Sequence, residues 1–130
     1  MLENRSTQAE IMDDLSCEGE VVNQTLRELN TINRLLGGNH LSIQGLDELS
    51  REKEQVLTVA DLGCGGGDIL IRMAEWARKK GKKMKFVGID ANPFIIEYAT
   101  KRCADYPEIS FQALNVFEEA FANQSFDIIH

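Results

Sequence analysis

The stretch 59-VADLGCGGGDIL-70 has four glycines between residues 63 and 67, directly after a run of apolar residues. Glycine loses more backbone freedom on folding than other residues, so such a cluster is costly unless bare backbone is needed. The preceding residues 56–62 are β-branched and apolar, which is typical of a buried strand, and helical periodicity begins at Asp68. A glycine loop before a helix N-terminus lets the backbone approach a ligand beside free N–H groups. We therefore expect a bound molecule to lie against this loop.

The spacing of the glycines disfavours the dinucleotide pattern G-x-G-x-x-G. Counted from Gly63, the third glycine would fall at Asp68, and an acid is unfavourable beside a pyrophosphate; counted from Gly65, it would fall at Leu70. The pattern that fits is D-x-G-x-G-x-G, beginning at Asp61. A leading carboxylate favours a cationic neighbour over a phosphate. A nicotinamide-dependent oxidoreductase is therefore the disfavoured alternative.

Strands and helices alternate after the glycine loop. Periodicity predicts helices over 68–80 and 92–105, the second with Asn92 as N-cap and Pro93 at the first helical position. Strands are predicted over 84–90, 109–114 and 125–130. This order predicts an α/β fold with a parallel sheet covered on both faces.

Residues 1–55 have a different character and are interpreted as an N-terminal helical lead-in or cap, separate from residues 56–130. Residues 1–18 are polar and predicted to be a loose lead-in. An amphipathic helix is predicted over 20–36, ended by Gly37 and Gly38, with its apolar face formed by Val22, Leu26, Leu29, Ile32 and Leu36. Residues 39–55 are interpreted as a connector, with a short helix possible from Leu46.

Composition narrows the class of protein. The 130 residues suffice for one domain, and 43% hydrophobic with 27% charged residues is an ordinary globular balance. A net charge of −7 makes nucleic acid an improbable partner, with residues 78–83 (RKKGKK) the only candidate basic patch. The sequence shows neither a membrane-spanning run nor a signal peptide. Its three cysteines are far apart, which predicts no metal site and reduced thiols in a cytoplasmic protein.

The residues VADLGCGGG resemble motif I of the class I S-adenosylmethionine-dependent methyltransferases, and further motifs follow in order over residues 56–130. The resemblance implies a Rossmann-like three-layer α/β/α fold with strand order 3-2-1-4 as far as the chain goes. It implies S-adenosylmethionine as cofactor, with Asp61 near its amino group. The loop of Gly63, Cys64, Gly65 and Gly67 would lie beneath the methionine and ribose.

The resemblance also implies roles at the next two strand ends. Asp90 follows Gly67 by 23 residues and matches the acid that binds the ribose hydroxyls, although it could instead cap the following helix. Ala91 would line the adenine side. Asn115 stands where many members have Asp, and it would contact the adenine amino group or satisfy local backbone. Val116 would contact the adenine ring.

His130 ends the fourth strand, next to the expected reaction site. It is a candidate general base toward a hydroxyl substrate, or simply a strand-end residue. Methyl transfer from a sulfonium needs positioning and exclusion of water and requires neither a metal nor a nucleophile triad. The function expected is methyl transfer to a small-molecule acceptor.

The main alternative is a truncated or non-catalytic cofactor-binding module, because the chain stops on a strand. In that case the fourth strand would be an exposed edge. We expect a homodimer through this edge or through the N-terminal helix.

Overall fold

The computed structural model describes residues 19–130, apart from the side chains of residues 33–36 and Glu119. The expected loose lead-in, including Cys17, lies outside the described residues. The elements are α2 (Glu20–Leu36), α3 (Gly38–Ser50), β1 (Leu57–Leu62), α4 (Asp68–Lys79), β2 (Met84–Asp90), α5 (Pro93–Arg102), β3 (Ile109–Ala113), α6 (Glu119–Ala122) and β4 (Ile128–Ile129).

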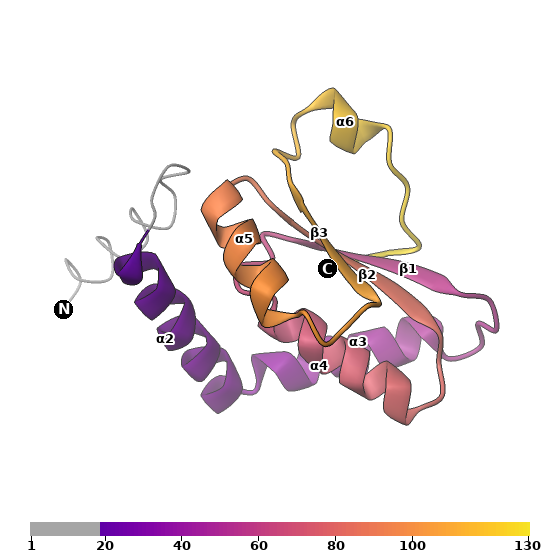
Figure 1. Ribbon diagram of the computed structural model, residues 1–130. Coiled ribbons are helices and arrows are strands. Elements are labelled where there is room, and N and C mark those ends of the chain that lie inside the picture. The colour runs from indigo at the N-terminus through magenta and orange to yellow at the C-terminus, as the bar shows by residue number, and fades with distance from the viewer. Residues whose placement is uncertain (1–18) are drawn as a thin grey trace.

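The four strands form one parallel sheet in the order β3-β2-β1-β4 (Figure 1). This confirms the predicted α/β class and strand order. Val59 pairs with Phe86, and Phe86 pairs with Ile109, so three apolar side chains share one face of the sheet. Because all strands are parallel, their carboxyl ends meet at one edge, where ligands bind in open α/β sheets.

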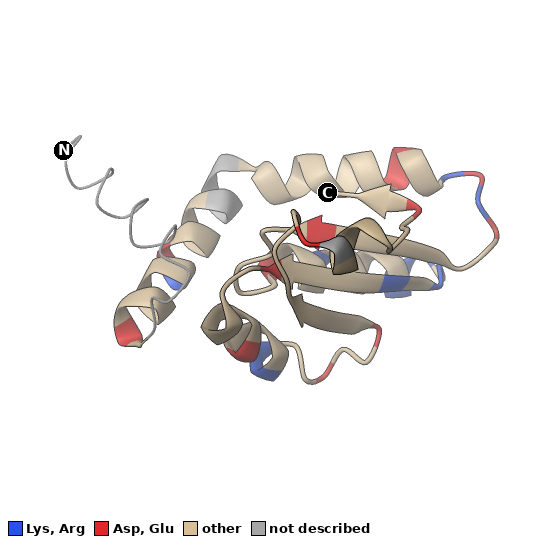
Figure 2. Cartoon of the chain, turned by 90° about the horizontal axis from the view of Figure 1, so that it is seen from above, with Lys and Arg blue, Asp and Glu red and all other residues tan. Residues whose placement is uncertain are grey.

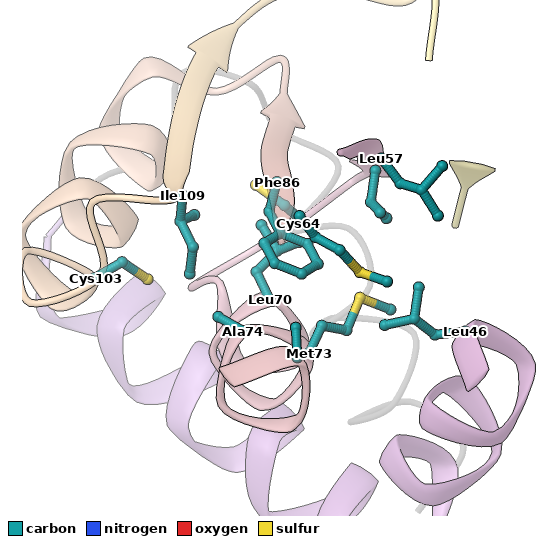
Figure 3. Close-up of a cluster of buried hydrophobic side chains, with 12 residues drawn as sticks. Leu46, Leu57, Cys64, Leu70, Met73, Ala74, Phe86, Cys103 and Ile109 are labelled. Carbon is teal, nitrogen blue, oxygen red and sulfur yellow. The ribbon is translucent and has the colours of Figure 1, made fainter. Parts of the chain in front are cut away.

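Helices α4 and α5 pack against β2 and β3, and α3 packs beside α4. The core between sheet and helices contains Phe86, Leu70 and Met73, all at most 2% exposed (Figure 3). Figure 1 shows α3 and α4 below the sheet and α6 above it. We expected helices on both faces of the sheet. On the upper face the described chain has only the four-residue helix α6.

The interpretation of residues 39–55 as a connector is wrong for residues 39–50, because α3 occupies Gly38–Ser50; the possible helix from Leu46 is its second part, and residues 51–55 are the connector. Gly37 adopts φ 74°, a left-handed conformation that glycine takes cheaply, and it separates α2 from α3 by a single residue. Ile43, Leu46 and Ser50 then recur at helical spacing on the face that packs inward. The Lys82 ammonium donates to the Ser50 carbonyl at 2.7 Å and satisfies the end of α3.

The predicted amphipathic helix is confirmed as α2, but its apolar face is only partly buried. Val22 and Leu26 pack with Ile95 of α5, whereas Leu29 and Ile32 are 43% and 48% exposed.

The basic run 78–83 contributes to intramolecular contacts. The Arg78 guanidinium donates to Glu108 at 2.7 and 2.6 Å and lies 4.8 Å from the Tyr106 ring centroid. The Lys82 ammonium donates to the carbonyl of Ser50, the last residue of α3. Figure 2 shows the Lys and Arg residues of the described chain spread over several helices and the loop before β1.

Candidate functional site

A cavity of about 460 Å³ opens at the carboxyl ends of β1 and β2, within the size range of small-ligand pockets, about 300–1,000 Å³. Its floor is the glycine loop, and one wall is made by α2 and α3. The lining residues are Leu26, Leu29, Asn30, Gly38, Asn39, Ser42, Asp61, Leu62, Gly63, Cys64, Gly65, Gly66, Asp68, Ile69, Asp90 and His130. The structure therefore brings together Asp61, Gly63, Cys64, Gly65, Asp90 and His130 of the predicted site.

The glycine loop is anchored at its start and open at its centre. The N–H groups of Gly63 and Cys64 both donate to the Ile89 carbonyl, at 2.7 and 3.1 Å. The N–H groups of Gly65 and Gly66 have no hydrogen-bond partner among the described residues. Both glycines line the cavity, so their N–H groups are available as donors for a ligand.

Two predicted loop residues have a packing role that the sequence did not reveal. Cys64 lines the cavity, and its side chain is buried in the core cluster with Leu70 and Phe86 (Figure 3). A Cβ on Gly67, at φ +81°, would lie 2.9 Å from Cys103 Sγ. Gly67 lies outside the cavity lining and lets α4 begin close to the sheet.

Asp61 and Asp90 make the cavity acidic. Asp61 is 4% exposed, and its burial raises the pKa of its carboxyl group; the hydrogen bond with His130 offsets part of this, and the charge of Asp90 adds to it. Asp68, at the first turn of α4, forms an ion pair with Arg102. The two acids at neighbouring strand ends therefore remain to attract a cationic ligand.

Asp90 has one oxygen engaged locally. Its Oδ1 accepts from the Asn92 N–H at 3.0 Å, while Asn92 caps α5 by accepting from the Phe94 N–H at 2.9 Å. Asp90 can therefore support the start of α5 and still bind ribose hydroxyls, because Oδ2 has no hydrogen bond among the described residues. A carboxylate with one oxygen held in place is well suited to accept further donors.

His130 lies between two polar side chains. Its Nδ1 is 2.8 Å from Asp61 Oδ1, and its Nε2 is 2.8 Å from Ser42 Oγ. The backbone is fixed as well, because the His130 N–H donates to Ala60 O and the His130 carbonyl accepts from Leu62 N–H. The ring is 40% exposed and borders the cavity.

Ala91, Asn115 and Val116 do not line this cavity. Asn115 Oδ1 accepts from the Phe117 N–H at 3.0 Å, the local arrangement expected of a loop asparagine. The loop nevertheless begins beside Asp90, because the Leu114 N–H donates to the Asp90 carbonyl at 2.9 Å. Nothing in the structure tests a contact of these three residues with adenine, which stays a prediction.

Sequence reasoning missed the contribution of α3. Asn39 and Ser42 line the cavity, and the Asn39 Nδ2 is buried with no hydrogen-bond partner in the described structure. A buried donor without a partner is costly, so Asn39 Nδ2 is a candidate donor to a ligand. The spacing of Ile43, Leu46 and Ser50 was the signal that would have identified the helix.

Two further structural features are absent from residues 19–130. No helix there is both long and apolar enough to cross a membrane. That same part of the chain has no group of three His, Cys, Asp or Glu side chains placed to hold a metal ion.

Comparison with known proteins places these features in a family. A family model described as a methyltransferase domain matches residues 53–130. The curated protein 2-phytyl-1,4-naphtoquinone methyltransferase of Trichormus variabilis (strain ATCC 29413 / PCC 7937) is 36% identical over 73 residues, which are 54% of this chain and 31% of that protein.

Solved structures of methyltransferases share the fold. The kinase-methyltransferase WbdD is 28% identical with a TM-score of 0.56, over 70% of this chain and 20% of the other. The DszA carbon methyltransferase has a TM-score of 0.58 at 19% identity, over 70% of this chain and 26% of the other. Coclaurine N-methyltransferase, crystallised with S-adenosylhomocysteine, has a TM-score of 0.54 at 15% identity, over 70% and 26%. The chain thus spans less than a third of the length of each.

Proposed function

Because the chain belongs to the methyltransferase domain family, we propose that it binds S-adenosylmethionine at the carboxyl ends of β1 and β2 and transfers a methyl group to a small-molecule acceptor. The observation that carries the proposal is the cavity itself. Its glycine floor has two open N–H donors, and Asp61 and Asp90 stand at neighbouring strand ends above it. This combination suits a positively charged nucleoside.

The residues present fit the parts of this cofactor. The Asp90 carboxylate would accept from the ribose hydroxyls. The N–H groups of Gly65 and Gly66 and the orphan Asn39 Nδ2 would donate to the carboxylate of the methionine portion. Asp61 would offset the positive charge of the ligand. Leu26, whose Cδ2 lies 3.5 Å from a Cβ built on Gly65, would close the cavity from α2.

When bound, the cofactor supplies an electrophilic methyl group on a sulfonium and leaves as S-adenosylhomocysteine. The chain's own task is positioning and the exclusion of water. His130 borders the cavity beside Asp61, where a general base would act on the acceptor. We propose Ala91, Asn115 and Val116 for the adenine end, which lies next to Asp90.

A small-molecule acceptor is supported by the curated relative, which is named for a naphthoquinone. We also propose a cytoplasmic location, supported by Cys64 and Cys103, which are free thiols. The competing proposal is a module that binds the cofactor without turnover.

Calorimetric titration tests the function directly. S-adenosylhomocysteine should bind and NAD should not. Binding of NAD alone, or of neither compound, would reject the proposal. Methyl transfer from labelled S-adenosylmethionine to a panel of phenols, amines and quinols then separates an enzyme from a binding module.

A further inference from the structure

Both ring nitrogens of His130 are engaged by side chains from other elements. Asp61 of β1 contacts Nδ1 and Ser42 of α3 contacts Nε2, each at 2.8 Å. An ionised carboxylate only accepts hydrogen bonds, so the proton of a neutral imidazole must lie on Nδ1. Nε2 then carries the lone pair and accepts from the Ser42 hydroxyl. The contacts therefore select one tautomer of His130.

His130 stands where two cavities meet. A second cavity of about 320 Å³ lies between α3 and β4 and shares only Ser42 and His130 with the first. Its remaining lining is largely apolar: Leu41, Gly45, Leu46, Leu49, Met73, Ile128 and Ile129. The Ser42–His130 hydrogen bond therefore lies at the boundary between the proposed cofactor cavity and an apolar one.

Ser42 is not arranged to act as a nucleophile itself, although the three residues have the order of a hydrolase triad. It lies inside α3, where backbone N–H groups are used by the helix and cannot form an oxyanion hole. Its Oγ also lies 3.3 Å from the Gly38 carbonyl. The hydroxyl can thus turn its proton either to Gly38 or to His130.

We propose that Ser42 and Asp61 are positioning residues, which hold His130 as the Nδ1–H tautomer so that Nε2 takes the proton of an acceptor hydroxyl. Resting on the proposed function, this names the acceptor class as a molecule with an apolar body and an ionisable hydroxyl. That hydroxyl replaces the Ser42 hydroxyl, whose Oγ lies 2.8 Å from Nε2. Its O–H bond breaks, an Nε2–H bond forms, and the imidazolium faces Asp61 until water removes the proton.

Nitrogen NMR of the imidazole rings tests the tautomer without any turnover. The sequence has two histidines, and His40 is exposed on α3 and serves as an internal reference, assigned with His40→Gln. In the neutral form we expect His130 to have a protonated Nδ1 and a bare Nε2, and His40 to have mainly the opposite tautomer. Ser42→Ala should shift the Nε2 resonance of His130, and Ser42→Thr should restore it. A protonated Nε2 in wild type, or no shift in Ser42→Ala, would overturn the inference.

The acceptor class is tested with phenol and anisole, which differ by the hydroxyl proton. Phenol should shift the His130 Nε2 resonance, and several-fold more readily in Ser42→Ala, where the place is vacated; anisole should not. Equal effects of the two compounds, or none, would reject the hydroxyl acceptor. S-adenosylhomocysteine binding, measured on the same samples, separates the two proposals. If the ligand binds but His130 has the other tautomer, only this inference is rejected. If the ligand does not bind, the proposed function is rejected.

Discussion

Asp61 and His130 are 69 residues apart in the sequence, yet Asp61 Oδ1 lies 2.8 Å from His130 Nδ1. They meet because β1 and β4 are parallel neighbours, so that their carboxyl ends coincide. Asp61 thereby has two potential partners, the imidazole of His130 and a cationic ligand in the cavity.

Asp61→Asn should stabilise the protein near neutral pH. Burial raises the pKa of Asp61 above its unfolded value of about 3.9, so the folded state binds the proton more tightly than the unfolded state. The free energy of unfolding therefore falls as pH rises through the window between the two pKa values. The amide of the Asp61→Asn variant does not titrate, so this loss of stability with rising pH disappears, and its oxygen still accepts a hydrogen bond from His130. Urea unfolding should show the variant more stable near pH 7 and equal to wild type in acid below the unfolded pKa.

Asp127→Asn is the matched control of opposite sign. The Thr58 backbone N–H and then its hydroxyl lower the pKa of Asp127, so its stabilisation is present above the unfolded pKa and is lost as pH falls. This variant should be less stable than wild type near neutral pH, with the difference shrinking in acid. Shifts of the same sign in both variants would contradict the assignment of burial as the cause at Asp61.

Asp90→Ala should weaken S-adenosylhomocysteine binding roughly 10- to 150-fold, since a hydrogen bond to a charged group contributes about 1.5–3 kcal/mol. Calorimetry measures the loss, and circular dichroism checks the fold, because Asp90 also accepts from Asn92. Asp105→Ala removes an exposed acid away from the cavity and should leave the affinity unchanged. Equal affinities of wild type and Asp90→Ala would remove the ribose assignment.

Gly67→Ala should cost more stability than Gly81→Ala. Both glycines have positive φ, so either alanine is strained by about 1–2 kcal/mol, but a Cβ at Gly81 meets nothing within 4 Å. At Gly67 it lies 2.9 Å from Cys103 Sγ, which adds an overpacking cost of about 1–3 kcal/mol. Cys103→Ala should recover part of this in the double variant. If urea unfolding shows the same loss of stability for both variants, the close packing of Gly67 against Cys103 is contradicted.

The predicted homodimer is tested by sizing chromatography with light scattering. β4 pairs with β1 alone among the described strands, and Ile129 is 57% exposed. If this edge forms the interface, Ile129→Lys should give monomers while Leu29→Lys on α2 should not. The reverse pattern would point to the N-terminal helix. A monomeric wild type would exclude both.

Much of the α/β unit was predictable because its signals are local. The strand ending at Leu62, the glycine loop and the Asn92–Pro93 cap are each set by neighbouring residues, and the structure shows each of them where it was expected. Helix α3 was not predicted over its full length because Gly38 and Gly45 lower the helix propensity of its sequence. Packing on α4 and the contact with Lys82 stabilise the helix instead.

By itself, the sequence determined the parallel strand–helix order and the place of the glycine loop, because residue periodicity and glycine spacing act over a few residues. Only the tertiary structure decided which side chains face the cavity and which support it. The Cys64 side chain packs in the core and Gly67 packs closely against Cys103. Ser42 and Asn39 line the cavity from the part of α3 that the sequence did not lead us to expect. The physical reason is that these placements depend on packing between α3, α4 and the sheet, contacts between residues far apart in the chain.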